Sequence, residues 1–251
     1  MSGLAAMMYR EARIRATNVT FIFWDVIYPL AYMLVFGVGM SSAMGAEFAG
    51  SGTGYSAFFL AGVLGMASFG IASNTAWSLF MDRDNGIFYE MLTYPLSRSA
   101  YLVGKVLFNI LVAFAQALVT VTLAAWLLDV DVRWVGLPLL LAALAVGTAG
   151  WFFFYATFAL MIRRNDAFNT VTSIFYFVFL FASSMFYPVD PLPPAFRVAA
   201  MANPITWQVD ILRFATIGTG NPSTLIAEGV GFIVFTMAAF AAALWSLRRQ
   251  E

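Results

Sequence analysis

Residues 137–162 read LPLLLAALAVGTAGWFFFYATFALMI and contain no charged side chain. A helix needs about 20 mainly apolar residues to cross the hydrocarbon core of a bilayer, and this run is long enough. Its apolar residues are continuous, whereas a strand of a membrane barrel would alternate apolar and polar residues. Backbone groups in hydrocarbon must pair internally, and a helix achieves this within one segment. The run therefore predicts a transmembrane helix.

The whole chain has the composition of a membrane protein. Of its 251 residues, 62% are hydrophobic and 10% are charged, and the mean hydropathy is +0.83. Soluble domains contain about 45–50% apolar and about 25% charged residues, so a soluble core of this size could not hold so much apolar surface. We therefore expect an all-α, polytopic membrane protein that forms a single transmembrane domain over residues 1–251.

Several classes of site are excluded by composition. The chain has no Cys and no His, which excludes disulfides, Cys/His metal sites and catalysis by either side chain. Its 13 basic and 13 acidic residues give a formal net charge of zero. Nucleic acid is therefore not an expected partner, because the basic footprint of such binding is missing.

Few catalytic arrangements remain for an enzyme inside the membrane, namely Ser with Lys or a pair of Asp. Lys105 is the only Lys, and near the end of an apolar run its ammonium group can extend to the cytoplasmic interface. Asp25 is the only carboxylate well inside a run. The pair Gly104-Lys105 lacks the glycine spacing of a P-loop. We expect no enzyme activity and no metal or cofactor in this chain, so another chain would bind ATP if ATP drives it.

Six apolar runs predict six spans, at residues 19–40, 55–81, 100–128, 134–162, 171–187 and 225–247. The basic residues of the connecting segments fall ten on one face and three on the other, which accounts for all 13. The face with more Lys and Arg is normally cytoplasmic. Both termini are therefore expected inside a plasma (inner) membrane.

The first 18 residues are predicted to form an interfacial helix. Leu4, Met7, Met8 and Ile14 fall within one arc of a helical wheel. Glu11 and Arg15 interrupt this arc, although at a spacing of i, i+4 they can pair with each other.

Residues 82–98 form a short segment on the expected cytoplasmic side. Asp84 or Asn85 can cap a short helix, and Pro95 ends it. Its apolar residues, Ile87, Phe88, Met91 and Leu92, share one face. Such a face indicates either a protein partner or contact with the bilayer surface.

Residues 188–221 are expected on the outer side. Four prolines, the first of them Pro188, break the helix, and a second helical pattern follows Asn203-Pro204. Ile205, Val209 and Leu212 share a face, but the stretch is too short and too charged to span. We interpret it as a re-entrant segment before the sixth span (222–247), with an ordinary surface helix as the alternative.

Two features suggest a substrate path. An Asp inside a span is a functional candidate, although Asp25 lies near the interface and pairing with an N-terminal Arg also fits. The fifth run is rich in aromatic residues and could form a wall for an amphipathic substrate, or it could simply face lipid. The candidate path residues are Asp25, Phe175, Tyr176, Phe179, Ser183 and Phe186.

Together these features resemble the membrane subunit of type-2 ABC exporters. The first span contains Pro29, and EMLTYPLSR at 90–98 with the following Gly-Lys resembles the coupling-helix motif of that family. SSMFYPVDPLP at 183–193 resembles the pattern after its fifth span, and NPIT at 203–206 resembles its outer Asn-Pro signature. One departure is Ser183-Ser184, where the family often has Ser-Gly.

The resemblance implies a homodimer of this subunit with two ATP-binding subunits, which would hold ATP and Mg. The amphipathic substrate, a drug, lipid, lipid-linked glycan or polysaccharide, would leave the cytoplasm or inner leaflet through a path between the two copies. Membrane lipid is a further expected partner. The implied partner-binding residues are Gly86, Ile87, Phe88, Glu90, Met91, Leu92, Pro95 and Arg98, and the outer motif is Pro188, Asn203 and Pro204. The alternative is a secondary transporter or channel that works alone, which usually carries several charges within the membrane.

Overall fold

The computed structural model describes residues 3–44, 54–91, 93 and 98–249. This part of the chain contains helices and loops and no strand, which confirms the all-α prediction. The elements are α1 (Gly3–Thr17), α2 (Val19–Ile22), a π-helical turn η1 (Phe23–Ile27), α3 (Tyr28–Met44), α4 (Tyr55–Asp84), α5 (Ile87–Met91), α6 (Arg98–Leu127), a 3-10 turn η2 (Trp134–Gly136), α7 (Leu137–Met161), α8 (Asn165–Phe181), α9 (Pro194–Met201), α10 (Pro204–Ile217) and α11 (Pro222–Arg248).

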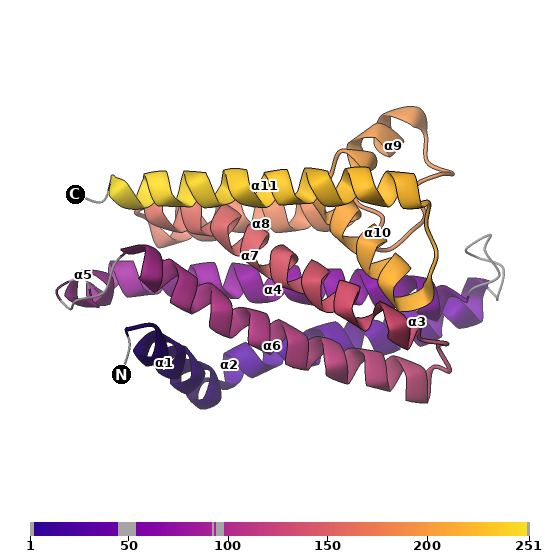
Figure 1. The fold of residues 1–251 in the computed structure, drawn as a ribbon, viewed down its shortest axis with the longest axis horizontal. Helices are drawn as coiled ribbons and strands as arrows, with labels where there is room; N and C mark the ends of the chain where they lie inside the picture. Colours follow the sequence, from indigo (N-terminus) through magenta and orange to yellow (C-terminus); the bar gives the residue numbers. More distant parts are fainter. Residues whose placement is uncertain (1–2, 45–53, 92, 94–97, 250–251) are drawn as a thin grey trace.

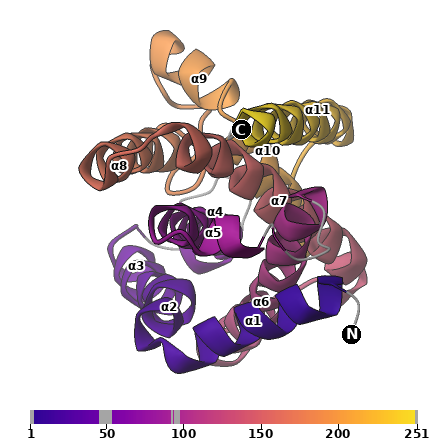
Figure 2. The same ribbon diagram turned by 90° about the vertical axis from the view of Figure 1, so that its left-hand side faces the viewer.

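The long helices run along one common direction, with α4 at the centre of the bundle (Figures 1 and 2). Helices α3, α6, α7 and α10 all pack against α4. Small residues make close packing possible: a Cβ added at Gly62 of α4 would lie 2.4 Å from the carbonyl oxygen of Met185. Glycine therefore lets the turn after α8 pack directly on the central helix.

Among the described residues, five helical stretches are long and apolar enough to cross a membrane, at 19–42, 55–84, 100–127, 134–161 and 222–248. They correspond to the first, second, third, fourth and sixth expected spans. The predicted fifth span is wrong in its limits, since α8 runs from Asn165 to Phe181 and not from 171 to 187. Its 17 residues give a length of roughly 25 Å, less than the hydrocarbon thickness of about 30 Å.

The early end of α8 has a local cause. The side-chain amide of Asn203 donates hydrogen bonds to the carbonyl oxygens of Phe179 and Ala182, at 2.8 and 2.6 Å. The Ser183 hydroxyl donates to the carbonyl of Leu180 at 2.7 Å. These bonds satisfy carbonyls that a helix end leaves without partners. The chain can therefore turn at residue 182 while it is still buried.

Both described ends of the chain lie at the same end of the bundle as α5, and α9 and α10 lie at the opposite end (Figure 1). Helix α1 crosses the long helices at the first end (Figure 2) and packs on α6. We refer to these as the α5 end and the α10 end. The expected orientation makes the α5 end cytoplasmic.

Because the native chain has no Cys, single cysteines report topology directly. Asp166→Cys, in the first turn of α8 at the α5 end, should react with an impermeant maleimide only from the cytoplasm. Asp131→Cys, in the exposed loop between α6 and α7, should react only from outside. The reverse pattern in intact cells and inverted vesicles would overturn the orientation.

Candidate functional site

A cluster of buried charges joins α1, α4 and α6 near the α5 end. Lys105 of α6 is fully buried. Its ammonium group donates to Glu11 of α1 at 2.8 Å and to Ser78 of α4 at 3.1 Å, and it lies 3.1 Å from Asp82 of α4. Asp82 also accepts two hydrogen bonds from Arg10 of α1. We call Arg10, Glu11, Asp82 and Lys105 the charge clamp.

The clamp corrects two expectations. Lys105 does not extend to the interface, because two carboxylates from distant segments surround its ammonium group inside the bundle. Glu11 and Arg15 do not form the local pair that their spacing allows. Glu11 binds Lys105, and Arg15 forms an ion pair with Asp25. Long-range partners replace local ones because burial makes every charge require a close counter-charge.

A second buried pair lies beside the clamp. Asp25 sits in the π-helical turn η1, and its Oδ1 accepts a hydrogen bond from Asn74 at 2.7 Å. Arg15, besides its ion pair with Asp25, donates to Thr75 and Asn109. Burial lowers the pKa of Arg15 to about 10, which still leaves it charged at neutral pH. Of the two roles considered for Asp25, the structure shows the pairing with an N-terminal Arg.

Helix α5 is attached to the clamp through an aromatic contact. Phe88 is fully buried and packs edge-to-face against Tyr101, with ring centroids 5.3 Å apart. Tyr101 donates its hydroxyl hydrogen to Asp82 at 2.7 Å. The apolar face predicted for this helix is thus not wholly free, since Phe88 belongs to the core of the chain itself. The segment starts at Gly86, whose φ of +77° favours glycine.

The structure describes only some of the other residues that the resemblance implies bind a partner. Ile87, Tyr89 and Glu90 are exposed, and Met91 is half-buried. Leu92 and Pro95 lie outside the described residues, and Arg98 is the first residue of α6. The cap expected at Asp84 or Asn85 belongs to the preceding helix, because α4 continues to Asp84 and Asn85 follows as its C-cap. Within α5 itself, the exposed side chains are therefore those of Ile87, Tyr89 and Glu90.

An aromatic groove of about 430 Å³ opens between the first span, α4 and α8. Its lining combines aromatic side chains with hydroxyl and amide groups. Its lining includes Trp24, Tyr28, Tyr32, Tyr176, Phe177 and Phe181, together with Ser73, Asn74, Thr172 and Ser173. Because Asn74 also binds Asp25, the groove lies directly beside the Arg15–Asp25 pair.

The candidate path residues are only partly brought together. Tyr176 lines the groove, and Phe186 stacks on Phe181 at its edge, with ring centroids 5.4 Å apart. Phe175 and Phe179 instead contact Phe154 of α7. Ser183 is fully buried and bonded to Leu180. Helical geometry explains the division, because positions 175 and 179 share a face that position 177 does not.

At the other end, α10 is packed among α4, α7 and α11. Ile205, Val209 and Leu212 are fully buried, as their shared face predicts. Buried hydrogen bonds tie the helix down: Trp151 of α7 donates to Gln208 at 2.8 Å, and Gln208 donates to Ser68 of α4 at 3.0 Å. The Asn203 side chain caps the helix by accepting from the Ile205 amide at 3.0 Å. The segment is thus part of the bundle.

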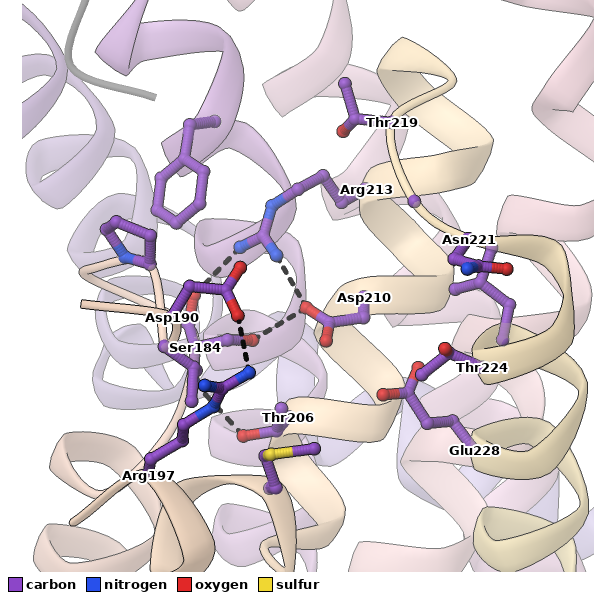
Figure 3. Close-up of a pocket in the computed structure, with 16 residues that line it drawn as sticks. Ser184, Asp190, Arg197, Thr206, Asp210, Arg213, Thr219, Asn221, Thr224 and Glu228 are labelled. Carbon is purple, nitrogen blue, oxygen red and sulfur yellow. Dashed lines mark hydrogen bonds and ion pairs between the residues drawn. The ribbon is translucent and has the colours of Figure 1, made fainter. Parts of the chain in front are cut away.

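A cavity of about 470 Å³ lies beside α10 at this end (Figure 3). It is surrounded by the turn that follows α8, by helices α9 and α10, and by the beginning of α11. Its charged lining residues are Asp190, Arg197, Asp210, Arg213 and Glu228. Glu228 lies near the start of the sixth expected span, and the sequence gives no signal that residues 184–228 would enclose a common space.

Comparisons with known proteins find a matching family model and several similar permeases. A family model described as "ABC-2 type transporter" matches residues 3–217. The chain is 24% identical over 195 residues to a protein of Pyropia yezoensis named as the transport permease ycf38, covering 75% of this chain and 65% of that protein. The ycf38 protein of Cyanophora paradoxa is 23% identical over 190 residues, with the same shares.

A bacterial protein is similar to the same degree. The chain is 26% identical over 198 residues to the daunorubicin resistance ABC transporter permease protein DrrB1 of Streptomyces coeruleorubidus, covering 78% of this chain and 68% of that protein. The chain thus spans about two thirds of the length of the curated relatives it matches.

The charge clamp should dominate the stability of the α5 end. Lys105→Met removes the closer of the two cations at Glu11 and leaves Arg10 alone to balance Glu11 and Asp82, so it should lower the free energy of unfolding by about 3–5 kcal/mol. Arg164→Met breaks only the exposed Arg164–Asp166 pair and should change it by less than about 0.5 kcal/mol. Unfolding in mixed detergent micelles measures both. Equal losses of stability in the two variants would show that the clamp contributes no more than an exposed ion pair.

The Asn203 side chain should stabilise the protein by more than a simple helix cap does. Asn203→Ala removes one capping bond and two bonds to α8, so we expect a loss of about 2–3 kcal/mol. Asn221→Ala removes an N-cap at the exposed start of α11 and should cost only about 1 kcal/mol. Thermal melting of both variants in detergent gives the comparison, and a smaller shift for Asn203→Ala would contradict the role in ending α8.

Proposed function

We propose, from its membership of the ABC-2 type transporter family, that this chain is the transmembrane permease subunit of an ATP-driven exporter. The observation that carries the mechanism is α5, a five-residue helix with exposed Ile87, Tyr89 and Glu90 whose buried Phe88 is fixed to the charge clamp. A short helix that is anchored at one end of a bundle and keeps exposed side chains is suited to bind a partner protein. ATP and Mg would bind to a separate subunit, because the sequence has no P-loop.

The contacts of α5 suggest how movement would be transmitted. A push on α5 passes through Phe88 to Tyr101, and from there to Asp82 and Lys105. These groups bind α4 and α6, and Glu11 connects them to α1. Helices held by several buried ion pairs move together more easily than they separate, because breaking one buried pair costs roughly 3–5 kcal/mol. A rigid-body motion of this unit would follow closure of the ATP-binding dimer.

The aromatic groove supports a path for an amphipathic substrate. Its aromatic side chains offer contact area to an apolar body, and its polar side chains, Ser73, Asn74, Thr172 and Ser173, offer hydrogen bonds to a polar part. A second copy of the chain packed over the first span and α8 would close the groove and complete a path between two subunits. The name of the relative DrrB1 refers to daunorubicin resistance, which makes a drug-like aromatic amphipath one candidate beside lipids, lipid-linked glycans and polysaccharides.

The alternative is a secondary transporter or channel that works alone, and such proteins usually carry several charged residues within the membrane. The structure holds more of these than Asp25 alone, since Arg15, Asp82 and Lys105 are buried as well. Each of these four lies within an ion pair, whereas Oε2 of Glu228, near the start of α11, has no hydrogen-bond partner among the described residues. Buried charges that already neutralise one another act as structural links. We therefore favour the permease of a two-component exporter, with several passes through the plasma membrane and both termini cytoplasmic.

The decisive experiment concerns attachment of an ATPase to α5. Glu90→Lys reverses a charge on an exposed position of α5, and Met91→Asp places an unpaired charge on a contact face. Each should reduce co-purification of the ATP-binding subunit by about tenfold or more, since truncated interface charge pairs lose roughly 2–5 kcal/mol. Asp166→Lys is the matched control, because it reverses an exposed charge at the same end of the bundle but outside α5.

Membrane insertion should be unchanged in all three variants, because none of them lies in a candidate span. Substrate-stimulated ATP turnover in proteoliposomes provides the second measurement. If both α5 variants retain the partner and the stimulated turnover of the wild type, the segment is not the point of coupling. If the purified chain alone transports, the stand-alone transporter replaces the proposal.

A further inference from the structure

The cavity at the α10 end contains an unbalanced charge. Arg197 binds Asp190 at 2.9 Å, and Arg213 binds Asp210 at 2.5 Å. Each arginine is thereby matched with one carboxylate. Glu228 is the third carboxylate that lines the cavity and has no arginine of its own. With all five side chains ionised, the charges of the lining would sum to one negative charge.

The surroundings of Arg213 explain why it does not form an ion pair with Glu228. Its guanidinium donates to Asp210 and to the carbonyl oxygen of Ser184, and it lies over the ring of Phe58 at 4.0 Å. The Ser184 hydroxyl donates to the same Asp210 oxygen at 2.8 Å. Asp210 and Arg213 thus form a closed pair whose position is fixed by the turn after α8.

Glu228 is placed to receive a cation. Its Oε2 is shielded from solvent and has no hydrogen-bond partner among the described residues. In Figure 3 the carboxyl group projects from α11 toward α10, on the side where Asp210 lies. Glu228 as a whole is half-buried, but a shielded carboxylate oxygen without a partner is unfavourable, so it favours uptake of either a proton or a positively charged group. The cavity beside it has room for a group much larger than a proton.

The side chains that line the cavity indicate which kind of cation it would bind. Apolar side chains line the cavity together with the charged ones, namely Phe58, Pro188, Val189, Met201 and Leu225. A divalent metal would need several converging oxygen ligands, and no group of three acidic residues with such an arrangement occurs in the described part of the chain. An organic cation needs only one counter-charge and an apolar surface for its body.

We propose that this cavity binds the ammonium group of an amphipathic amine or of a lipid headgroup, with Glu228 as its counter-charge. The apolar lining contacts the carbon skeleton, and Asp210 provides a second acceptor close to the ammonium group. The site lies at the opposite end of the bundle from α5. Binding here needs no ATP-binding partner, so the proposal can stand or fail independently of the exporter function.

The test uses dansylcadaverine, a dye with one primary amine, and its N-acetyl derivative, which has the same body and no charge. Binding to the purified full chain in maltoside micelles is followed by dye fluorescence. Wild type should bind the amine at least about tenfold more tightly than the acetylated dye, because a hydrogen bond to a charged group contributes about 1.5–3 kcal/mol. Glu228→Gln should abolish this preference.

Asp131→Asn is the matched control. It removes a carboxylate from the exposed loop between α6 and α7, outside the cavity, and should keep the full preference for the amine. If Glu228→Gln does not yield folded protein, Thr224→Trp offers a second route: it obstructs the cavity from an exposed position on α11 and should weaken binding of both dyes.

The source of the ammonium group is distinguished by adding phosphatidylethanolamine to the micelles. A fall in apparent dye affinity for wild type would show that the lipid headgroup competes for the cavity, and an unchanged affinity would assign the site to free amines. Equal affinities of the two dyes for wild type, or a preference for the amine that persists in Glu228→Gln, would overturn the proposal.

Discussion

The ammonium group of Lys105 imposes the strongest single constraint on this structure. It is fully buried in a chain whose solvent is largely hydrocarbon, so it requires anionic partners within hydrogen-bonding distance. Glu11 and Asp82 meet this requirement from two other helices. The position of α1 across the end of the bundle follows from the bond to Glu11. Through Tyr101, the same cluster also fixes Phe88 and hence α5.

Neutral amide side chains make many of the contacts at the opposite end of the bundle, beside the Asp210–Arg213 pair. Asn203 binds carbonyl oxygens that the end of α8 exposes, and it caps α10 with the same side chain. Gln208 links α10 to α4 and α7 through two further hydrogen bonds. Irregular backbone within a membrane protein is tolerated where other parts of the protein satisfy it. These bonds allow a broken helix at this end without exposing unpaired polar groups.

The two cavities differ in a way that fits their positions. The groove beside α8 has aromatic and hydroxyl groups and no charge in its lining, whereas the cavity beside α10 contains five charged residues. An amphipathic molecule would meet an apolar surface in the first and a counter-charge in the second. In the proposed export, with the α5 end cytoplasmic, such a molecule would reach the charged cavity after the aromatic groove.

The sequence by itself determined the membrane class, the all-α fold, five of the spans and the family, because long apolar runs and short motifs are local signals. It also marked the face of α10 formed by Ile205, Val209 and Leu212, since a helical period shows which positions share a side. The end of α8 at Phe181 was decided by the side chain of Asn203, which lies more than twenty residues later in the chain. Likewise, the roles of Lys105, Phe88 and Glu228 appear only in the tertiary structure. Each depends on which charges and rings from distant helices come within a few ångströms, and spacing along the chain does not encode that distance.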